Sequence, residues 1–236
     1  MEYFTFNLIY LMLVHLITVY SKKFDNFISS NHRQIETSSS IIKVRSELEC
    51  VSLCTRHDDC CFANYRDSTK ECSVGTSNRC HASSVYAYGW QLLRRGRIYQ
   101  NKVFYHIGDT KKWSDAQDFC DSFRMRLATV SSSNENEFLK SLTNYPNGIW
   151  LGGSDSLSEG TWRWNKPTRD MTFYDWGRVL FVPQPNGYIV SNCLSYFNCD
   201  PLATSYEWVD EPCSVSNPFL CERVVRVDGD TWPIED

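Results

Sequence analysis

The chain has 236 residues, of which 42% are hydrophobic and 22% are charged. This composition is typical of a folded globular protein and excludes disorder over most of the length. The net charge is −4 at pH 7, and no basic stripe runs along the chain, so the sequence is not that of a nucleic-acid-binding protein.

The N-terminal segment from Phe6 to Val19 is apolar except for Asn7, His15 and Thr18. It is shorter than the roughly 20 apolar residues of a membrane-spanning helix, and Val19 and Ser21 suit the small-residue positions before a cleavage site. We therefore predict a signal peptide at 1–21 and a mature protein that is secreted and not embedded in a membrane. A signal anchor or a buried helix is the alternative.

The chain contains 11 cysteines, which agree with an oxidising, extracellular compartment. Zinc ligation would require close Cys or His pairs repeated at matched spacing, whereas only Cys60 and Cys61 are adjacent. The cysteines form two groups with a gap between Cys80 and Cys120. The basic segment 94–97, Arg-Arg-Gly-Arg, lies in this gap, and we expect it to be an exposed linker between two domains.

The first cysteine group, from Cys50 to Cys80, lies in a region where we predict one helix and two strands. Ser46 and Glu49 form a capping box, which predicts a short helix beginning after Ser46. Alternating residues predict a strand over Cys61–Arg66, and Cys72–Val74 is expected to be the strand that returns. About 70 residues with a thin apolar core would be only marginally stable without covalent cross-links.

This region resembles the PAN/apple family through Cys50-Val-Ser-Leu-Cys54, then Cys60, then Ala63-Asn64-Tyr65, then Lys70-Glu71-Cys72-Ser73-Val74. In that family two disulfides hold a helix on the sheet, and the resemblance implies Cys50–Cys72 and Cys54–Cys60. Cys61 and Cys80 are left over, and we expect them to form a third pair. Members of the family bind proteins or sugars, and these residues do not distinguish the two.

The second region is predicted to begin with a strand at 103–107. Trp113, Ala116, Cys120 and Phe123 recur at spacings of three and four, which predicts a helix over 113–123. Further elements are expected in this order: a strand at 127–130, a helix at 134–142, and strands at 149–153 and 161–164.

Two capping pairs are open for the second of these helices, Ser132 with Glu135 or Asn134 with Glu137. From the last predicted strand to Asn192 the chain is rich in turn residues. Long structured loops of this kind are usually functional.

The second region closely resembles the C-type lectin-like domain. The matching strings are Trp113-Ser-Asp-Ala116 through Cys120, Trp150-Leu-Gly-Gly153, Ser154-Asp155 through Glu159-Gly160-Thr-Trp162-Arg-Trp164, Gln184-Pro185-Asn186, Asn192-Cys193, Trp208-Val209-Asp210, Cys213 and Phe219-Leu220-Cys221-Glu222. The resemblance implies Cys120–Cys221 and Cys193–Cys213. Cys199 then has no partner, so it is either a free thiol or the site of a disulfide-linked dimer.

Calcium is the one cofactor that the resemblance implies. In the family a calcium ion lies under the long loop and coordinates two sugar hydroxyls, and the loop proline is usually cis. Gln184-Pro185-Asn186 matches the loop motif, with Pro185 as the cis-proline candidate, and Asp210 matches a further ligand. Ser191 and Val209 stand where the family has a carboxylate and an asparagine. The ligand set is therefore reduced to Gln184, Asn186 and Asp210, of which only Asp210 is charged, and a strong site is not expected.

The loop motif also leaves the sugar class open. Gln184 is similar to the galactose-type loop, whereas Asn186 is similar to the mannose-type loop. Asp155 and Glu159 match an auxiliary calcium position of some family members, but their other partners are incomplete, and we interpret them as turn and cap residues.

No nucleophile, base and orienting group occur together in a pattern typical of an active site, so we expect no enzyme. The predicted fold class is α+β and disulfide-rich. The expected organisation is a signal peptide at 1–21, a PAN/apple-like domain at 22–93, a linker at 94–97, a C-type lectin-like domain with two helices, antiparallel sheets and a long loop at 98–223, and an acidic tail at 224–236.

Two hypotheses for function remain. The first is a secreted lectin whose long loop binds carbohydrate, as a glycan or on a glycoprotein. The alternative is a calcium-independent protein-interaction or extracellular matrix protein on the same scaffold. For such an interface, aromatic anchors are available in the long loop: Phe173, Tyr174, Phe181 and Tyr188.

Overall fold

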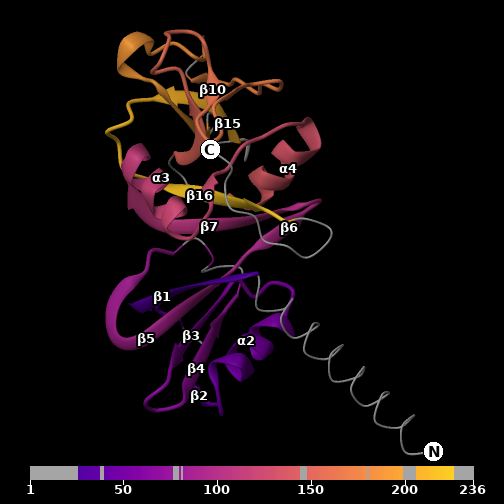
Figure 1. Cartoon of the computed structure of the whole chain (residues 1–236), viewed down its shortest axis with the longest axis vertical. Helices are drawn as coiled ribbons and strands as arrows, with labels where there is room; N and C mark the ends of the chain where they lie inside the picture. The colour runs from indigo at the N-terminus through magenta and orange to yellow at the C-terminus, as the bar shows by residue number, and fades with distance from the viewer. Residues whose placement is uncertain are drawn as a thin grey trace, which may run out of the picture. The chain divides into compact units, whose positions relative to one another are not determined.

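The computed structural model describes residues 26–37, 40–76, 80, 82–143, 148–179, 181–198 and 206–225 (Figure 1). The predicted signal peptide, Cys199 and residues 226–236 of the acidic tail lie outside the described residues. The chain divides into two compact units, one formed by Met1–Cys80 and Val85–Gly96 and the other by His81–Ser84 and Arg97–Asp236. Within the described part of the chain, no helix is long and apolar enough to span a membrane.

The N-terminal unit is one antiparallel sheet with a helix packed on it (Figure 1). The strand order is β1-β5-β3-β4-β2. The elements are β1 (Phe27–Gln34), β2 (Ile42–Lys43), α2 (Glu47–Thr55), β3 (Phe62–Arg66), β4 (Glu71–Gly75) and β5 (Val85–Arg95). The core between α2 and the sheet is small and rich in half-cystines, which agrees with the expectation that cross-links supplement a thin core.

The predicted helix cap is present. The Ser46 Oγ accepts a hydrogen bond from the Glu49 N–H at 3.3 Å, so α2 begins directly after Ser46. In a standard capping box the Glu49 carboxylate would accept from the N–H of the N-cap residue, Ser46. Here it accepts from the N–H of the preceding residue, Arg45, at 2.7 Å.

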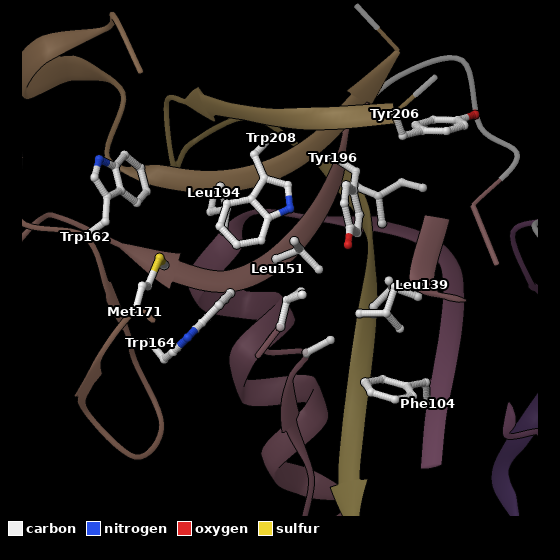
Figure 2. Close-up of a cluster of buried hydrophobic side chains, with 14 residues drawn as sticks. Phe104, Leu139, Leu151, Trp162, Trp164, Met171, Leu194, Tyr196, Tyr206 and Trp208 are labelled. Carbon is white, nitrogen blue, oxygen red and sulfur yellow. The ribbon is translucent and has the colours of Figure 1, made fainter. Parts of the chain in front are cut away.

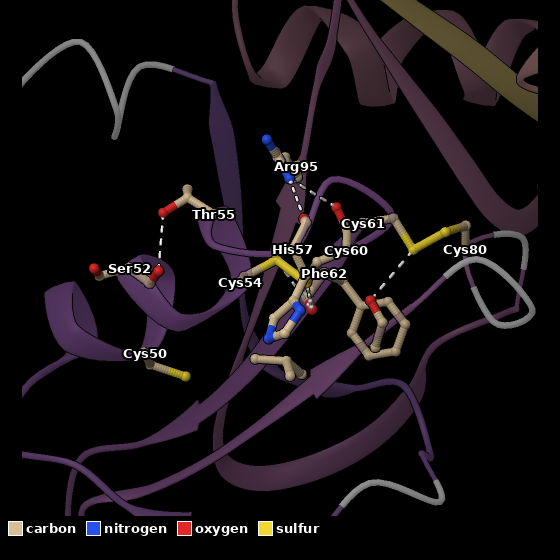
Figure 3. Close-up of a disulfide and its surroundings, with 12 residues drawn as sticks. Cys50, Ser52, Cys54, Thr55, His57, Cys60, Cys61, Phe62, Cys80 and Arg95 are labelled. Atoms are coloured by element: carbon tan, nitrogen blue, oxygen red, sulfur yellow. Dashed lines mark hydrogen bonds between the residues drawn. A yellow bond between two sulfur atoms is a disulfide. The ribbon is translucent and has the colours of Figure 1, made fainter.

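Three disulfides cross-link this unit: Cys50–Cys72, Cys54–Cys60 and Cys61–Cys80. These are the pairs expected from the sequence. The first joins α2 to β4, and the second joins the end of α2 to the segment before β3. Figure 3 shows the adjacent cysteines Cys60 and Cys61 leading to different partners. The helix is therefore fixed to the sheet at both ends of its buried face.

The division between the two units falls within the predicted segment 94–97, between Gly96 and Arg97, but this segment is not an exposed linker. Arg94 and Arg95 are the last residues of β5, where they pair with Ile28 and Phe27 of β1, and Arg94 is only 4% exposed. The Arg95 guanidinium donates to the carbonyl oxygens of His57 and Cys60 at 2.9 and 3.3 Å (Figure 3). The next strand, β6 (Arg97–Tyr99), begins after Gly96 alone. Charge alone would predict that Arg94 and Arg95 lie in solvent. Instead, pairing of β5 with β1 and hydrogen bonds to backbone carbonyls hold them within the unit.

The C-terminal unit contains a nine-stranded sheet and a separate two-stranded ribbon, β12–β13. The main path of the sheet is β11-β10-β9-β16-β7-β6, with β14 pairing β9 and β15, and β8 pairing β16. All pairs are antiparallel except β9 with β16. The strands are β7 (Lys102–Lys111), β8 (Arg126–Leu127), β9 (Ile149–Ser154), β10 (Arg163–Trp164), β11 (Arg169–Asp170), β12 (Arg178–Val179), β13 (Val182–Pro183), β14 (Cys193–Asn198), β15 (Tyr206–Glu211) and β16 (Asn217–Val224).

Both helices predicted for this unit are present, as α3 (Trp113–Ser122) and α4 (Ser133–Ser141), and a short 3₁₀ helix, η2 (Tyr188–Val190), lies in the long loop. Of the two capping pairs, Ser132 with Glu135 is the one that forms, with the Glu135 N–H donating to the Ser132 Oγ at 3.3 Å. The disulfide Cys120–Cys221 joins α3 to β16, and Cys193–Cys213 joins the start of β14 to the segment after β15.

A cluster of aromatic rings forms the core under the long loop (Figure 2). Trp208 is fully buried, and the rings of Trp164, Phe173 and Trp176 meet it edge to face at 5.7–5.9 Å between centroids. The Asn136 Oδ1 accepts from the Trp208 Nε1–H at 3.1 Å and from the Tyr196 hydroxyl at 2.6 Å. The polar edges of these rings are thus satisfied inside the core.

A buried amide in the N-terminal unit generates a stability prediction. The Asn64 side chain, 1% exposed, accepts from the Ile35 N–H at 3.0 Å and donates to the Ile35 carbonyl at 2.8 Å. Asn64→Ala would leave two buried backbone groups of Ile35 without these partners. We expect it to lower the free energy of unfolding by about 2–3 kcal/mol in a urea titration. Asn31→Ala removes an exposed amide contact and should change it by less than about 0.5 kcal/mol. Equal effects of the two substitutions would contradict the role of Asn64.

Candidate functional site

The long loop between β11 and β14 is anchored to β15 by backbone hydrogen bonds. The Trp208 N–H donates to the Asp175 carbonyl and the Gly177 N–H donates to the Trp208 carbonyl, both at 2.9 Å. The Gln184 N–H then donates to the Gly177 carbonyl at 3.0 Å, which ties the later half of the loop to the earlier half. The loop therefore has a fixed course through its middle, although it contains little regular secondary structure.

Asp210 of β15 holds the tip of the predicted motif. Its Oδ1 accepts from the Asn186 N–H at 2.8 Å, and its Oδ2 accepts from the Gly187 N–H at 2.6 Å. The carboxylate is 8% exposed, so both of its oxygens are directed into the protein. Hydrogen bonds of this kind, from amides to an ionised group, are short and strong.

Gly187 is required by this arrangement. A Cβ atom at this position would lie 2.1 Å from the Ser191 Cβ and 2.6 Å from the Asp210 Oδ2. No side chain fits such a close approach, so the loop can fold onto Asp210 only with glycine here. The Gln184–Pro185 peptide bond before it is cis, as expected for Pro185.

A pocket of about 410 Å³ lies beside the motif. It is formed by the β12–β13 ribbon, the residues after it, and strands β14 and β15. Its lining is half apolar and half polar: Val179, Val182, Phe197 and Val209, and Gln184, Asn186, Asp210 and Glu211. The structure thus brings the three predicted site residues, Gln184, Asn186 and Asp210, together at one pocket.

The residues at this pocket do not fit a calcium ion. Calcium requires six to eight oxygen ligands, and charged ones give it affinity. Asp210 is the one carboxylate of the predicted ligand set, and both of its oxygens accept backbone N–H bonds. Val209, 3% exposed, contributes an apolar surface to the pocket in place of an amide. In the part of the chain that the structure describes, no group of three His, Cys, Asp or Glu residues is arranged to hold a metal.

Asp155 and Glu159 occupy a turn next to this region. The Asp155 Oδ2 accepts from the Gly160 N–H at 2.9 Å, and the Asp155 carbonyl accepts from the Ser158 N–H at 2.9 Å. Burial raises the pKa of Asp155, and the charge of Asp210 adds to the effect. The pKa of Glu159 is also raised, mainly by desolvation and to a smaller extent by the charges of Asp155 and Asp210. These contacts support the interpretation of Asp155 as a turn residue.

Glu211 is a pocket residue that the sequence analysis did not select. Burial raises its pKa, with a smaller contribution from Asp210, while the hydrogen bond from the Asn217 Nδ2 at 2.6 Å acts in the opposite direction. A Cβ at Gly148 would lie 2.6 Å from that nitrogen and 2.7 Å from the Glu211 Oε1. Alternation along β15 could have indicated Glu211, because it places this residue on the same side of the strand as Val209.

The four aromatic residues proposed for a protein interface differ in their exposure to solvent. Phe181 is 92% exposed and Tyr174 is 50% exposed, whereas Phe173 packs against the core. The Tyr188 side chain lies outside the described residues. Ile189 and Val190, not selected from the sequence, are 77% and 69% exposed.

Comparison with known proteins agrees with the two units. The family model for the Lectin C-type domain matches residues 109–223, and the model for the PAN domain matches residues 22–95. A C-type lectin, galactose-binding isoform, from Pseudechis porphyriacus is 31% identical over 139 residues, which are 56% of this chain and 79% of that protein. This chain belongs to the C-type lectin family. The α+β fold and the PAN domain that precedes the lectin domain are those expected from the sequence.

The fraction of each protein that this chain matches differs among the other relatives. A perlucin-like protein from Mytilus galloprovincialis is 26% identical over 63% of this chain and 89% of its own length. The chain spans only 13–39% of the length of several mammalian C-type lectin domain family members that it matches. Among solved structures, a mouse scavenger receptor C-type lectin carbohydrate-recognition domain is 22% identical, covers 56% of this chain and 95% of its own, and has a TM-score of 0.48.

The two bonds accepted by Asp210 can be tested by Asp210→Asn. The amide offers one acceptor oxygen and turns its NH₂ group toward the other N–H. Hydrogen exchange at the Asn186 and Gly187 amides should then accelerate by about 10–100-fold. Asp170→Asn removes a carboxylate paired with Arg163 on the surface of the same domain, where ion pairs contribute little, and should leave both rates unchanged. Unchanged exchange in Asp210→Asn would show that the carboxylate does not hold the loop.

The raised pKa of Glu211 predicts a pH dependence of stability. A carboxyl group whose pKa is higher in the folded than in the unfolded state favours folding at low pH, and this contribution is lost as the pH rises through the folded-state pKa. Glu211→Gln keeps an acceptor for Asn217 but does not titrate. Relative to this variant, the wild-type protein should lose stability in urea titrations as the pH is raised from the ordinary range of a glutamate pKa toward neutrality. A constant difference across that range would contradict the raised pKa.

Proposed function

We propose that this lectin is a secreted, extracellular recognition protein without enzymatic activity, whose long loop binds carbohydrate on a glycan or glycoprotein. The observation that carries the proposal is the pocket next to Gln184-Pro185-Asn186. It is formed by a loop that Asp210 holds in place, and it presents side-chain amides at its surface. A preorganised concave site with a few directed polar groups suits a small ligand.

The proposed compartment is supported by the covalent structure. Five disulfides are present in the described residues, and such bonds persist in oxidising, extracellular environments. The apolar segment before residue 22 suits a cleaved signal peptide. The PAN domain would add a second weak site on the same chain, which raises the overall avidity without any change in the loop.

We further propose that recognition does not depend on calcium. The carboxylate of Asp210 is already used by the loop backbone, and Val209 supplies no ligand atom. The loop therefore has its own support in the place where other members of the family are expected to use the ion.

A second candidate function is binding of a protein through the loop tip. Phe181 is almost fully exposed and has a φ of 70°, a left-handed backbone conformation that is unusual for a bulky residue. Ile189 and Val190 add exposed apolar surface to the same loop. Aromatic and aliphatic anchors of this kind are typical of protein interfaces.

Binding of the mature protein to immobilised glycans, in millimolar calcium and in chelator, tests the proposal. We expect the same glycans to bind in both, and the Tm to differ by less than about 1 °C. An ion at 100 times its Kd would instead add about 2.7 kcal/mol and raise the Tm by several degrees. Binding that is lost in chelator would overturn calcium independence. Absence of binding to any glycan would overturn the carbohydrate function in favour of a protein ligand.

A further inference from the structure

A second pocket, of about 400 Å³, lies within the N-terminal unit. It is formed by the start of α2, the turn between β3 and β4, and the middle of β5: Ser46, Glu47, Tyr65, Asp67, Lys70, Gly89 and Gln91. Almost all of these residues carry polar side chains. The carbohydrate function proposed for the long loop uses none of them.

Gly89 leaves one edge of this pocket without a side chain. Its φ is 80°, a left-handed conformation that favours glycine, and its N–H donates to the His32 Nδ1 at 3.1 Å. The pairing of β1 with β5 shifts register at this point, between Asn31 and Arg33. The irregular backbone of β5 therefore has a fixed position and keeps the pocket open on this side.

The one ammonium group at the pocket already has its counter-ion. The Lys70 Nζ donates to the Asp67 Oδ1 at 2.6 Å and to the Tyr65 hydroxyl oxygen at 3.4 Å. The Tyr65 hydroxyl in turn donates to the same Asp67 oxygen at 2.8 Å. The charges of Lys70 and Asp67 therefore compensate each other.

Glu47 is the charge at the pocket that lacks a counter-ion. Its carboxylate has no hydrogen bond or ion pair among the residues that the structure describes. Desolvation raises the pKa of Glu47, and the charge of Asp67 adds to this effect. The group lies in the first turn of α2, where the helix dipole favours a negative charge. A cation in the pocket would offset the repulsion between the two carboxylates.

Three side chains present open acceptor oxygens to such a cation. Within the described ranges of the chain, the two oxygens of Glu47, the Asp67 Oδ2 and the Gln91 Oε1 accept no hydrogen bond. The amide nitrogen of Gln91 is used by the Asn31 Oδ1 at 3.3 Å. A primary ammonium group carries three N–H donors and a positive charge, which matches three acceptors with one uncompensated negative charge.

We propose that this pocket binds a primary ammonium group, either the end of a lysine side chain on a protein partner or a small free amine. Glu47 supplies the charge, and Asp67 and Gln91 supply the remaining acceptors. This ligand would bind to the PAN domain and would be independent of any sugar held by the long loop.

Three lysine derivatives test the proposal in NMR titrations of the ¹⁵N-labelled mature protein. They are Nα-acetyl-lysine N-methylamide, its Nε-acetylated form, which has no charge, and its Nε-trimethylated form, which is charged but has no N–H donor. The amide signals of Glu47 and Gln91 should shift with the first derivative. We expect it to bind about tenfold more tightly than the acetylated form and about threefold more tightly than the trimethylated form.

A fourth probe, n-butylamine, distinguishes the two sources of the ammonium group. It has the same charge and donors as the lysine derivative but none of its peptide groups. Tighter binding of the lysine derivative assigns the pocket to a lysine side chain, whereas equal affinities assign it to small amines.

Variants assign the binding to the pocket. Glu47→Gln removes the charge at nearly constant size, and because Ser46 provides the helix cap, folding does not depend on Glu47. It should weaken binding of the lysine derivative about tenfold. Gln91→Met removes one neutral acceptor and should weaken it about threefold. Glu49→Gln removes a carboxylate from the same turn of α2 outside the pocket lining, and should change the affinity by less than about twofold.

Two kinds of result would overturn the assignment. Equal affinities of the three lysine derivatives would show that the protein does not recognise an ammonium group. An equal loss in Glu47→Gln and Glu49→Gln, or no shift of the Glu47 and Gln91 signals, would show that the amine is attracted to the acidic surface and not held in the pocket. Glycan binding by the long loop would be unaffected by any of these results.

Discussion

The carboxylate of Asp210 is the constraint on which the candidate site depends. It accepts two backbone N–H bonds, from Asn186 and Gly187, and so connects the tip of the long loop to β15. Because the group is nearly buried, these bonds are protected from competition with water. The course of the loop tip beside the pocket therefore follows from one side chain being committed to the backbone of the loop.

The other end of this support lies in the aromatic core. Trp208 is two residues before Asp210 on β15, and its ring is fixed by three neighbouring rings and by Asn136. Its backbone also binds the early part of the loop, because its N–H donates to the Asp175 carbonyl and its carbonyl accepts from the Gly177 N–H. Strand β15 therefore holds the loop both through backbone hydrogen bonds of Trp208 and through the side chain of Asp210. These contacts allow an irregular segment to keep a defined surface.

Much of the fold could be predicted because its signals are local or covalent. Ser46 and Ser132 mark helix starts through contacts three residues away, and the cysteine spacing matches known families. The burial of Arg94 could not be predicted in this way, since it depends on pairing with β1, more than 60 residues earlier in the chain. The site residues were identified by motif, but the motif did not indicate that Asp210 would face amides. Glu211 was missed because its pKa depends on burial that only the assembled strands create.

The close approach at Gly187 restricts which residue the loop tip can carry. A Cβ at this position would lie 2.1 Å from the Ser191 Cβ and 2.6 Å from the Asp210 Oδ2. A methyl group at 187 would therefore push the loop away from β15 or displace the carboxylate that the Asn186 and Gly187 amides share. The smallest side chain would thus be enough to change the shape of the pocket without altering any residue that lines it.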